Sequence, residues 1–368
     1  MKSNLLKKLV LSLTAASIMA GPVASQACTS FTLSGKDTGY VYARTLEFGL
    51  PLESNVITIP RNLHYTGVGS DGKPGTGIIW DTKYAAVGMN GLNQPILIDG
   101  MNEVGMTGGL LNAPNTAQYQ HTEAKDSANS IASYQMLIYA LTNFKTVEEA
   151  KAGFRSIQVN DSTLAVYKGV VPVRMTLHDA QGKSATFEYL KGQLVITDNP
   201  TGVMTNDPAF AWHLDNIGNY ANLTPVERDG IKIGDKTFVP PSSGSGLAHI
   251  PGDMLSTSRF IRAVALTQAA PKNMTNVQQV NAAWHILGSF DISPGSVSLP
   301  ATNSYGGGAG GYEVTEWSTV ADTKNMVYYV KMYENVTPQA FDFSKTDKDA
   351  KSIQTYKPAH VQSIEKLN

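Results

Sequence analysis

The chain of 368 residues contains a single cysteine, Cys28, and this limits how a fold built from it can be stabilised. One cysteine cannot form an internal disulfide, so stability must come from a buried core. Hydrophobic residues make up 42% of the chain and charged residues 16%, a balance typical of a globular protein with a sizeable core. The single thiol is left over for reactivity or for an intermolecular bond.

The residues before Cys28 have the pattern of a secretory signal peptide. Lys2, Lys7 and Lys8 form a basic start, a mainly apolar run covers residues 9–20, and Ser25-Gln26-Ala27 puts small side chains at the −3 and −1 positions. The apolar run is well short of the roughly 20 residues that a membrane-spanning helix needs. We therefore predict cleavage between Ala27 and Cys28. Residues 1–27 would be the signal peptide, and residues 28–368 a single exported domain, periplasmic or secreted.

Charge and hydropathy exclude two classes of partner. The formal net charge is −1 for the whole chain, and it becomes −4 once the three lysines of the signal peptide are removed. No basic stripe is present to meet phosphates, so we expect no nucleic-acid partner. No second apolar stretch approaches spanning length, so we expect no stable membrane insertion.

Periodicity predicts alternating groups of strands and helices. Short β-branched and aromatic runs bounded by Gly, Pro or Asp predict strands, and apolar residues at helical spacing predict helices. The expected strands are 28–33, 40–46, 55–60, 95–100, 105–111, 165–189 and 312–333; the expected helices are one from 130 to 141, one opened by Thr146, and those at 257–269 and 276–287. This order predicts an α+β fold in which helices cover antiparallel or mixed sheets.

Several local signals refine this plan. Thr146 with Glu149, and Thr275 with Gln278, have capping-box spacing at two helix starts. The turn Asp179-Ala180-Gln181-Gly182 separates two strand-like runs. Residues 239–246 indicate a surface loop rather than a domain linker. Residues 306–311 match the G-x-G-x-x-G spacing, but no helix follows them, so we expect a flexible loop and no dinucleotide site.

Other catalytic classes lack their signals. No two of the seven histidines stand at metal-ligand spacing, so we expect no metal centre. Ser245 lies between two glycines, but the G-x-S-x-G elbow of a serine hydrolase is absent.

Cys28 itself leaves several readings open. Cleavage after Ala27 would place a thiol and a free α-amine on one residue, a nucleophile with a base attached. A lipid-anchored binding protein is the competing class, although Ser25 and Gln26 make a poor lipobox. A buried cysteine acting as a small hydrophobe is the third reading. A papain-like hydrolase with a separate histidine lacks the flanking sequence.

Five segments together resemble one family. The segments are Cys28-Thr29-Ser30-Phe31, residues 43–48 (ARTLEF), 99–106 (DGMNEVGM), 203–208 (VMTNDP) and 251–262, in which Pro251-Gly252-Asp253 precedes Ser258-Arg259-Phe260-Ile261-Arg262. In sequence order they resemble motifs of the choloylglycine hydrolase and penicillin V acylase family. These are N-terminal-nucleophile cysteine amidases with a four-layer αββα fold of two stacked antiparallel sheets between helical layers. The resemblance spans most of the predicted mature chain.

The resemblance implies a role for each matching residue. Cys28 is the implied nucleophile with its α-amine as base, and Arg44 would favour the thiolate. The Asn206 side chain and the backbone N–H of Asn112 would bind the oxyanion. Arg259 would hold the charges around the N-terminus.

Glu47 departs from the family pattern, because well-studied members have Asp there holding the α-amine. Each residue also has a plainer reading. Arg44 and Glu47 could form a surface ion pair, Asn206 could serve a turn, and Arg259 could lie on an exposed helix face.

The implied activity is hydrolysis of a linear N-acyl amide with a hydrophobic acyl group through a thioester. Export favours penicillin V or an N-acyl homoserine lactone as substrate. Asparagine at position 112 favours the alternative, a conjugated bile salt. The resemblance further implies no cofactor and a homo-oligomer such as a tetramer.

Overall fold

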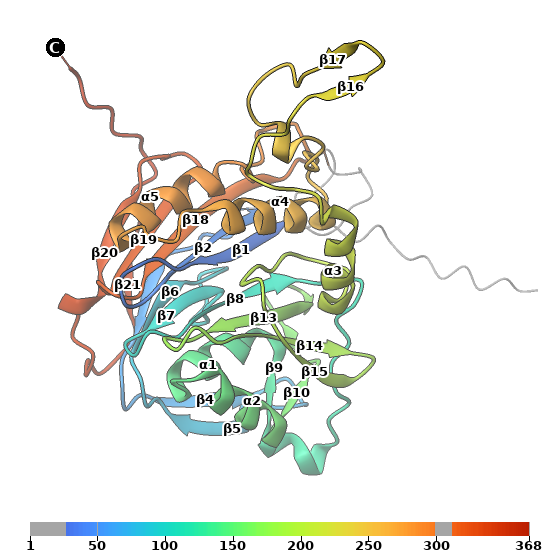
Figure 1. The fold of residues 1–368 in the computed structure, drawn as a ribbon. Helices are drawn as coiled ribbons and strands as arrows, with labels where there is room; N and C mark the ends of the chain where they lie inside the picture. The colour runs from blue at the N-terminus through green and yellow to red at the C-terminus, as the bar shows by residue number, and fades with distance from the viewer. Residues whose placement is uncertain (1–26, 50, 299–310, 368) are drawn as a thin grey trace, which may run out of the picture.

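The structure is a computed structural model that describes residues 27–49, 51–298 and 311–367. Figure 1 shows two stacked sheets with helices on their outer faces. The predicted signal peptide, apart from Ala27, and residues 306–310 of the glycine-rich segment lie outside the described residues. The cleavage site therefore stays a prediction.

The first sheet carries Cys28. It has five strands, all antiparallel, with Cys28 as the first residue of an edge strand. In spatial order they are β1 (Cys28–Leu33), β2 (Val41–Phe48), β18 (Val314–Asp322), β19 (Val327–Met332) and β20 (Gln339–Asp342).

The second sheet is larger, and it is also antiparallel throughout. Its eight strands are, in spatial order, β15 (Gln193–Asp198), β14 (Ser184–Leu190), β13 (Val173–His178), β8 (Thr107–Asn112), β7 (Asp99–Asn102), β6 (Ala86–Met89), β3 (Val56–Ile59) and β21 (Gln354–Tyr356).

Helices cover the two outer faces. α4 (Ser256–Ala269) and α5 (Asn276–Leu287) pack on the first sheet, and α1 (Met136–Asn143) packs on β7 and β8 of the second, with α2 (Val147–Ser156) beside it. α3 (Phe210–Ile217) lies at the edge of the stack. The predicted four-layer αββα arrangement is confirmed.

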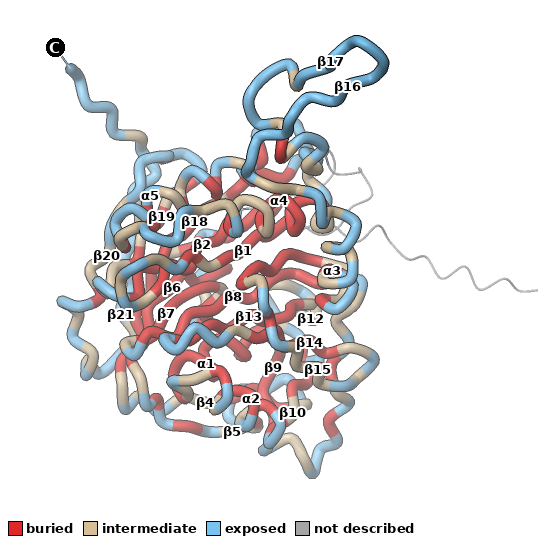
Figure 2. Tube along the Cα trace, viewed as in Figure 1, coloured by how far each residue is buried: buried red, intermediate tan, exposed pale blue. Residues whose placement is uncertain are grey.

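Two hydrophobic clusters account for the layering. One joins the two sheets to α4 and α5 through side chains such as Phe31, Trp317, Leu111, Phe260 and Leu287. The other seals α1 and α2 against the outer face of the second sheet, through side chains such as Leu137, Phe154, Leu110 and Phe187. Both faces of the second sheet are therefore buried, as the red core in Figure 2 shows. Each face must be covered because an uncovered apolar face would remain in water.

The expected helix from 130 to 141 is partly wrong. Ser130–Ala132 form strand β9, which pairs in parallel with β10 (Gln158–Asn160), and the helix begins at Met136. The side chain of Gln135 accepts a hydrogen bond from the backbone N–H of Val68 at 2.8 Å. The segment before the helix is thus held by pairing with distant strands, which outweighs its helical periodicity.

The helix caps at α2 and α5 are confirmed with one difference. The Thr146 hydroxyl accepts from the Glu149 N–H at 3.1 Å, but the Glu149 carboxylate accepts from the Lys145 N–H at 3.0 Å rather than from that of Thr146. Thr275 and Gln278 form the reciprocal capping box at α5.

Some elements were not anticipated. The sequence patterns gave no indication of α3, β15, the antiparallel pair β4 (His64–Val68) with β5 (Pro74–Asp81), or the pair β16 (Ile231–Ile233) with β17 (Lys236–Phe238). They also missed β11 (Thr163–Leu164), although its partner β12 (Gly169–Val170) lies within the predicted strand region 165–189. The β16–β17 hairpin projects from the body and is exposed (Figures 1 and 2). Most of residues 239–246, the predicted surface loop, are exposed too. Among the described residues no helix is long and apolar enough to cross a membrane.

Candidate active site

Cys28 lies at the start of β1, paired with Leu46 of β2, and only 4% of it is exposed. The ladder continues one residue upstream, where the carbonyl of Ala27 accepts from the Glu47 N–H at 2.9 Å. The strand therefore holds the peptide bond between Ala27 and Cys28 beside Glu47. A thiol buried between the sheets is poorly placed for a lipid anchor, which must lie at the surface of the protein.

Asn206 forms hydrogen bonds with three other residues of the site. Its side-chain oxygen Oδ1 accepts from the backbone N–H of Cys28 at 2.6 Å and from Arg259 Nη2 at 2.9 Å. Its amide Nδ2 donates to the carbonyl of Asn112 at 2.8 Å. Two donors on Oδ1 fix the orientation of the amide. Among the described residues Nδ2 donates only to the Asn112 carbonyl, so its second N–H can serve a ligand.

Arg259, on α4, joins Asn206 to strand β1. Its Nη1 donates to the Cys28 carbonyl at 2.6 Å and to the Thr29 hydroxyl at 2.7 Å. Only 1% of the residue is exposed, so the reading of Arg259 as an exposed helix face is wrong. The buried guanidinium fixes three groups around the start of β1.

Arg44 is fully buried under the thiol, and its pairing is not the one that sequence spacing suggested. Its guanidinium lies 3.9 Å from Asp99 Oδ2, and Nη1 donates to the carbonyls of Ile98 and Leu110 at 2.9 Å each. The positive charge of Arg44 also acts on the Cys28 thiol, whose pKa it lowers. Glu47 is likewise buried, so the surface ion pair of Arg44 with Glu47 is wrong.

Opposing influences act on the Cys28 thiol. Burial raises its pKa most, the nearby Glu47 raises it further, and Arg44, Arg259 and a hydrogen bond from the backbone N–H of Asn112 lower it. The net pKa of the thiol is raised, so a base is needed to generate thiolate at neutral pH. No histidine is among the main influences on the pKa of the thiol, which argues against a papain-like pair.

Two buried carboxyl groups lie beside the N-terminus of β1. Burial raises the pKa of Glu47 to about 7 and that of Glu313 to about 8, and each is opposed by Arg259. The Thr315 hydroxyl donates to Glu47 Oε1 at 3.3 Å, while Glu47 Oε2 has no hydrogen-bond partner among the described residues. An unpaired carboxylate oxygen can accept a hydrogen bond from a nearby donor.

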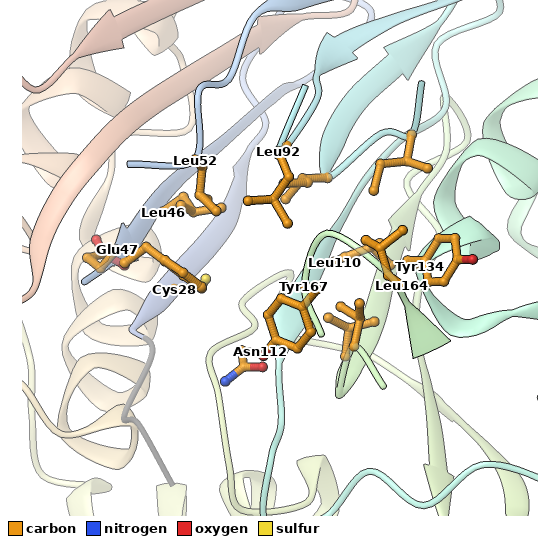
Figure 3. A pocket seen from close by; sticks show the side chains of 16 residues that line it. Cys28, Leu46, Glu47, Leu52, Leu92, Leu110, Asn112, Tyr134, Leu164 and Tyr167 are labelled. Carbon is orange, nitrogen blue, oxygen red and sulfur yellow. The ribbon is translucent and has the colours of Figure 1, made fainter. Parts of the chain in front are cut away.

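A cavity opens in front of the thiol. Cys28, Glu47 and Asn112 lie on its wall, and the other lining residues are almost all apolar or aromatic; they include Leu46, Leu52, Leu92, Leu110, Tyr134, Leu164 and Tyr167. Figure 3 shows the Cys28 sulfur turned toward this cavity. The site can thus accept a hydrophobic group whose polar end reaches the thiol.

The structure brings all six predicted site residues together: Cys28, Arg44, Glu47, Asn112, Asn206 and Arg259. The sequence reading assigned no role to Asp99 or Glu313. Asp99 opens the segment of residues 99–106 whose resemblance to the family was noted, so its position carried a signal. The position of Glu313 carried no such signal, because a lone Glu at a strand end is usually solvated.

Two antiparallel sheets between helical layers, with a buried cysteine opening the first strand, define the fold of the N-terminal-nucleophile hydrolases. Residues 28–356 match the family described as linear amide C–N hydrolases, choloylglycine hydrolase family. The chain belongs to this family.

Named relatives agree with that assignment. The chain is 30% identical over 343 residues to a bile salt hydrolase/transferase of Clostridium perfringens, covering 93% of this chain and 100% of the relative. It is 26% identical over 358 residues to a penicillin V acylase of Pectobacterium atrosepticum, covering 91% and 85% respectively.

Solved structures agree as well. A mutant of the conjugated bile acid hydrolase from Clostridium perfringens superposes with a TM-score of 0.80 at 28% identity, over 93% of this chain and 100% of that one. The penicillin V acylase of Agrobacterium tumefaciens, at 22% identity with a TM-score of 0.71 over 89% and 90% of the two chains, shares the fold.

Proposed function

We propose that this chain hydrolyses a linear N-acyl amide with a hydrophobic acyl group, using Cys28 as an N-terminal nucleophile. The observation that carries the proposal is the hydrogen-bonded set of Cys28, Asn206 and Arg259, in which Cys28 lies on the wall of an apolar cavity. Such a set joins a nucleophile, a fixed amide donor and a binding site for an apolar group.

The first half of the reaction forms a thioester. After cleavage behind Ala27, the neutral α-amine of Cys28 takes the thiol proton, and the thiolate attacks the amide carbonyl carbon. The tetrahedral intermediate then collapses, the C–N bond breaks, and the leaving amine takes the proton from the α-ammonium group.

The second half releases the acid. Water gives a proton to the α-amine and attacks the thioester carbonyl, and the C–S bond breaks to return the thiol and the carboxylic acid. In both halves the carbonyl oxygen becomes negative. The free N–H of Asn206 Nδ2 and the backbone N–H of Asn112 are the donors that we assign to it.

Glu47 is the group that we assign to the α-amine. Cleavage would free the N–H groups of Cys28 beside a carboxyl whose Oε2 has no partner among the described residues, and the Glu47 backbone already pairs with Ala27. The longer side chain of Glu, compared with Asp, is held in place by the hydroxyl of Thr315.

For the substrate we retain penicillin V or an N-acyl homoserine lactone as the first candidate, because a cavity with almost no polar wall suits a phenoxyacetyl or alkyl chain. Conjugated bile salts are the second candidate, and the 30% identity to a relative named bile salt hydrolase/transferase favours them.

We also propose export to the periplasm or outside the cell, after removal of residues 1–27. A homo-oligomer such as a tetramer is proposed too. The β16–β17 hairpin supports it, because Ile231, Ile233 and Phe238 are exposed on an arm that projects from the body.

The test has two parts. The N-terminus of the exported protein, determined by mass spectrometry, is expected to be Cys28, and Cys28→Ala is expected to abolish hydrolysis. Full activity in Cys28→Ala, or a mature chain that begins elsewhere, contradicts the mechanism. Measuring kcat/KM on penicillin V, N-acyl homoserine lactones and glycine- or taurine-conjugated bile salts then ranks the substrates.

A further inference from the structure

A buried ion pair outside the predicted site holds the loop that carries Asn206. Arg174 is on β13 and Glu188 on β14; they are 1% and 2% exposed, and Arg174 Nη1 donates to Glu188 Oε1 at 2.7 Å. A charged pair is costly to bury, and it is retained where its geometry serves other groups.

The other groups are backbone carbonyls of the Asn206 loop. Arg174 Nη2 donates to the carbonyl of Thr205 at 2.6 Å and to that of Asn206, and Nη1 donates to that of Pro208 at 2.7 Å. The planar guanidinium therefore contacts residues on both sides of Asn206 at once. Lysine, with a single charged nitrogen, cannot reproduce this fork.

Glu188 completes the clamp from the other side of the loop. Its two carboxylate oxygens accept from the backbone N–H of Phe210 at 3.1 Å each. Phe210 is the first residue of α3, which directly follows the loop. The ion pair thus ties the loop's carbonyls and the helix start to two neighbouring strands of the second sheet.

The same strand also positions the other proposed oxyanion donor. Val173 of β13 is the antiparallel partner of Asn112, the last residue of β8. The backbone N–H of Asn112 and the side chain of Asn206 are thus both held in place by adjacent residues of the same rigid strand, β13. Because the strand fixes the distance between the two donors, the protein does not have to reorganise them during the reaction.

We propose that Arg174 and Glu188 are positioning residues for the oxyanion site: they fix Asn206 relative to Asn112 and do not touch the substrate. This inference rests on the proposed function, because it takes Asn206 as an oxyanion donor. Loss of the clamp lets the Asn206 amide shift, which weakens transition-state binding more than substrate binding.

The experiment compares Arg174→Lys with wild type in the processed protein, using the best amide of the panel. We expect kcat to fall about 10- to 100-fold, the range typical of groups that orient a catalytic residue, with KM changed less than about threefold. Glu188→Gln keeps an acceptor for Phe210 and loses the charge, so its kcat should lie between that of wild type and that of Arg174→Lys.

An aldehyde with the same acyl chain gives a second readout. It forms a hemithioacetal with Cys28 whose oxygen occupies the oxyanion site, whereas the corresponding alcohol cannot form this adduct. For penicillin V these probes are phenoxyacetaldehyde and 2-phenoxyethanol. Aldehyde affinity should fall in Arg174→Lys in parallel with kcat, and alcohol affinity should not change.

A matched control separates positioning from general destabilisation. Lys151 is 8% exposed and forms a remote ion pair with Glu148 and Asp198, so Lys151→Met removes a pair without touching the loop. It should keep wild-type kcat and aldehyde affinity. Titration of reactive Cys28 by alkylation corrects every kcat for the folded fraction.

The outcomes are distinguishable. Wild-type kcat and aldehyde affinity in Arg174→Lys, or losses fully explained by the folded fraction, overturn the positioning role while the proposed function stands. If Cys28→Ala remains active, the proposed function itself has failed, whatever Arg174→Lys does.

Discussion

The backbone N–H of Cys28 donates to the side-chain oxygen of Asn206 at 2.6 Å, although 178 positions separate the two residues in sequence. Arg259 donates to the same oxygen. The Asn206 amide is therefore oriented from one side by β1 and by α4, which directs one N–H of Nδ2 to the carbonyl of Asn112.

This orientation predicts the result of Asn206→Asp. The aspartate keeps an oxygen for Cys28 and Arg259 but loses the N–H donor that we assign to the oxyanion. We expect kcat to fall about 10²- to 10³-fold with KM little changed, measured by steady-state kinetics. Asn219→Asp, at an exposed asparagine, is the control. A kcat within threefold of wild type would remove Asn206 from the oxyanion site.

A second prediction concerns Gly109, which makes room for Arg44. A Cβ at position 109 would lie 2.9 Å from Arg44 Nη1 and 2.5 Å from the Tyr42 hydroxyl. Gly109→Ala should displace the guanidinium from the thiol, so the pKa of Cys28 rises. Alkylation by iodoacetamide at pH 7 should slow about tenfold for each unit of that rise.

The control for this prediction is Gly218→Ala. No atom lies within 4 Å of the position of its Cβ, and Gly218 has a right-handed helical backbone, so alanine is tolerated. Alkylation at the wild-type rate in Gly109→Ala would show that Arg44 does not control the thiol.

A third prediction concerns the apolar wall of the cavity. Leu52 is 4% exposed and lines the cavity. Leu52→Gln puts an amide where the acyl group would bind, and burying an unpaired amide costs about 1–3 kcal/mol. We expect KM for a hydrophobic amide to rise about tenfold or more. Ile79→Gln, at an exposed isoleucine of β5, should leave KM unchanged; an equal rise there would mean that the effect is not local to the cavity.

A fourth prediction uses the buried carboxyl of Glu313, whose pKa is raised by burial from 4.5 to about 8. Between these values the unfolded chain releases this proton while the folded protein keeps it. Folding stability therefore falls as pH rises through this window, and the loss is complete above the folded-state pKa. Glu313→Gln remains neutral at every pH and avoids this loss.

The measurement is urea unfolding of both proteins from pH 4 to pH 9. Stabilities should be similar near pH 4, and Glu313→Gln should be more stable by roughly 1–4 kcal/mol at pH 9, since one pKa unit corresponds to about 1.4 kcal/mol. Parallel stability curves across this range would contradict the raised pKa.

The sequence by itself determined the strand that carries Cys28, the helices α4 and α5, the capping box at the start of α5, and the family. These follow from short-range patterns: alternation along 28–33, capping at Thr275, and motifs whose order matched a known family. It also indicated the six site residues, because their joint occurrence outweighed a plain reading of each one alone.

Only the tertiary structure decided how those residues act on each other. Arg44 pairs with Asp99 and not with its near neighbour Glu47, because adjacent strands and stacked sheets set side-chain contacts. Residues 130–132 became a strand since a distant partner strand lay beside them. The Arg174–Glu188 clamp on Asn206 is equally non-local, and no spacing along the chain reports the burial that makes such a pair matter.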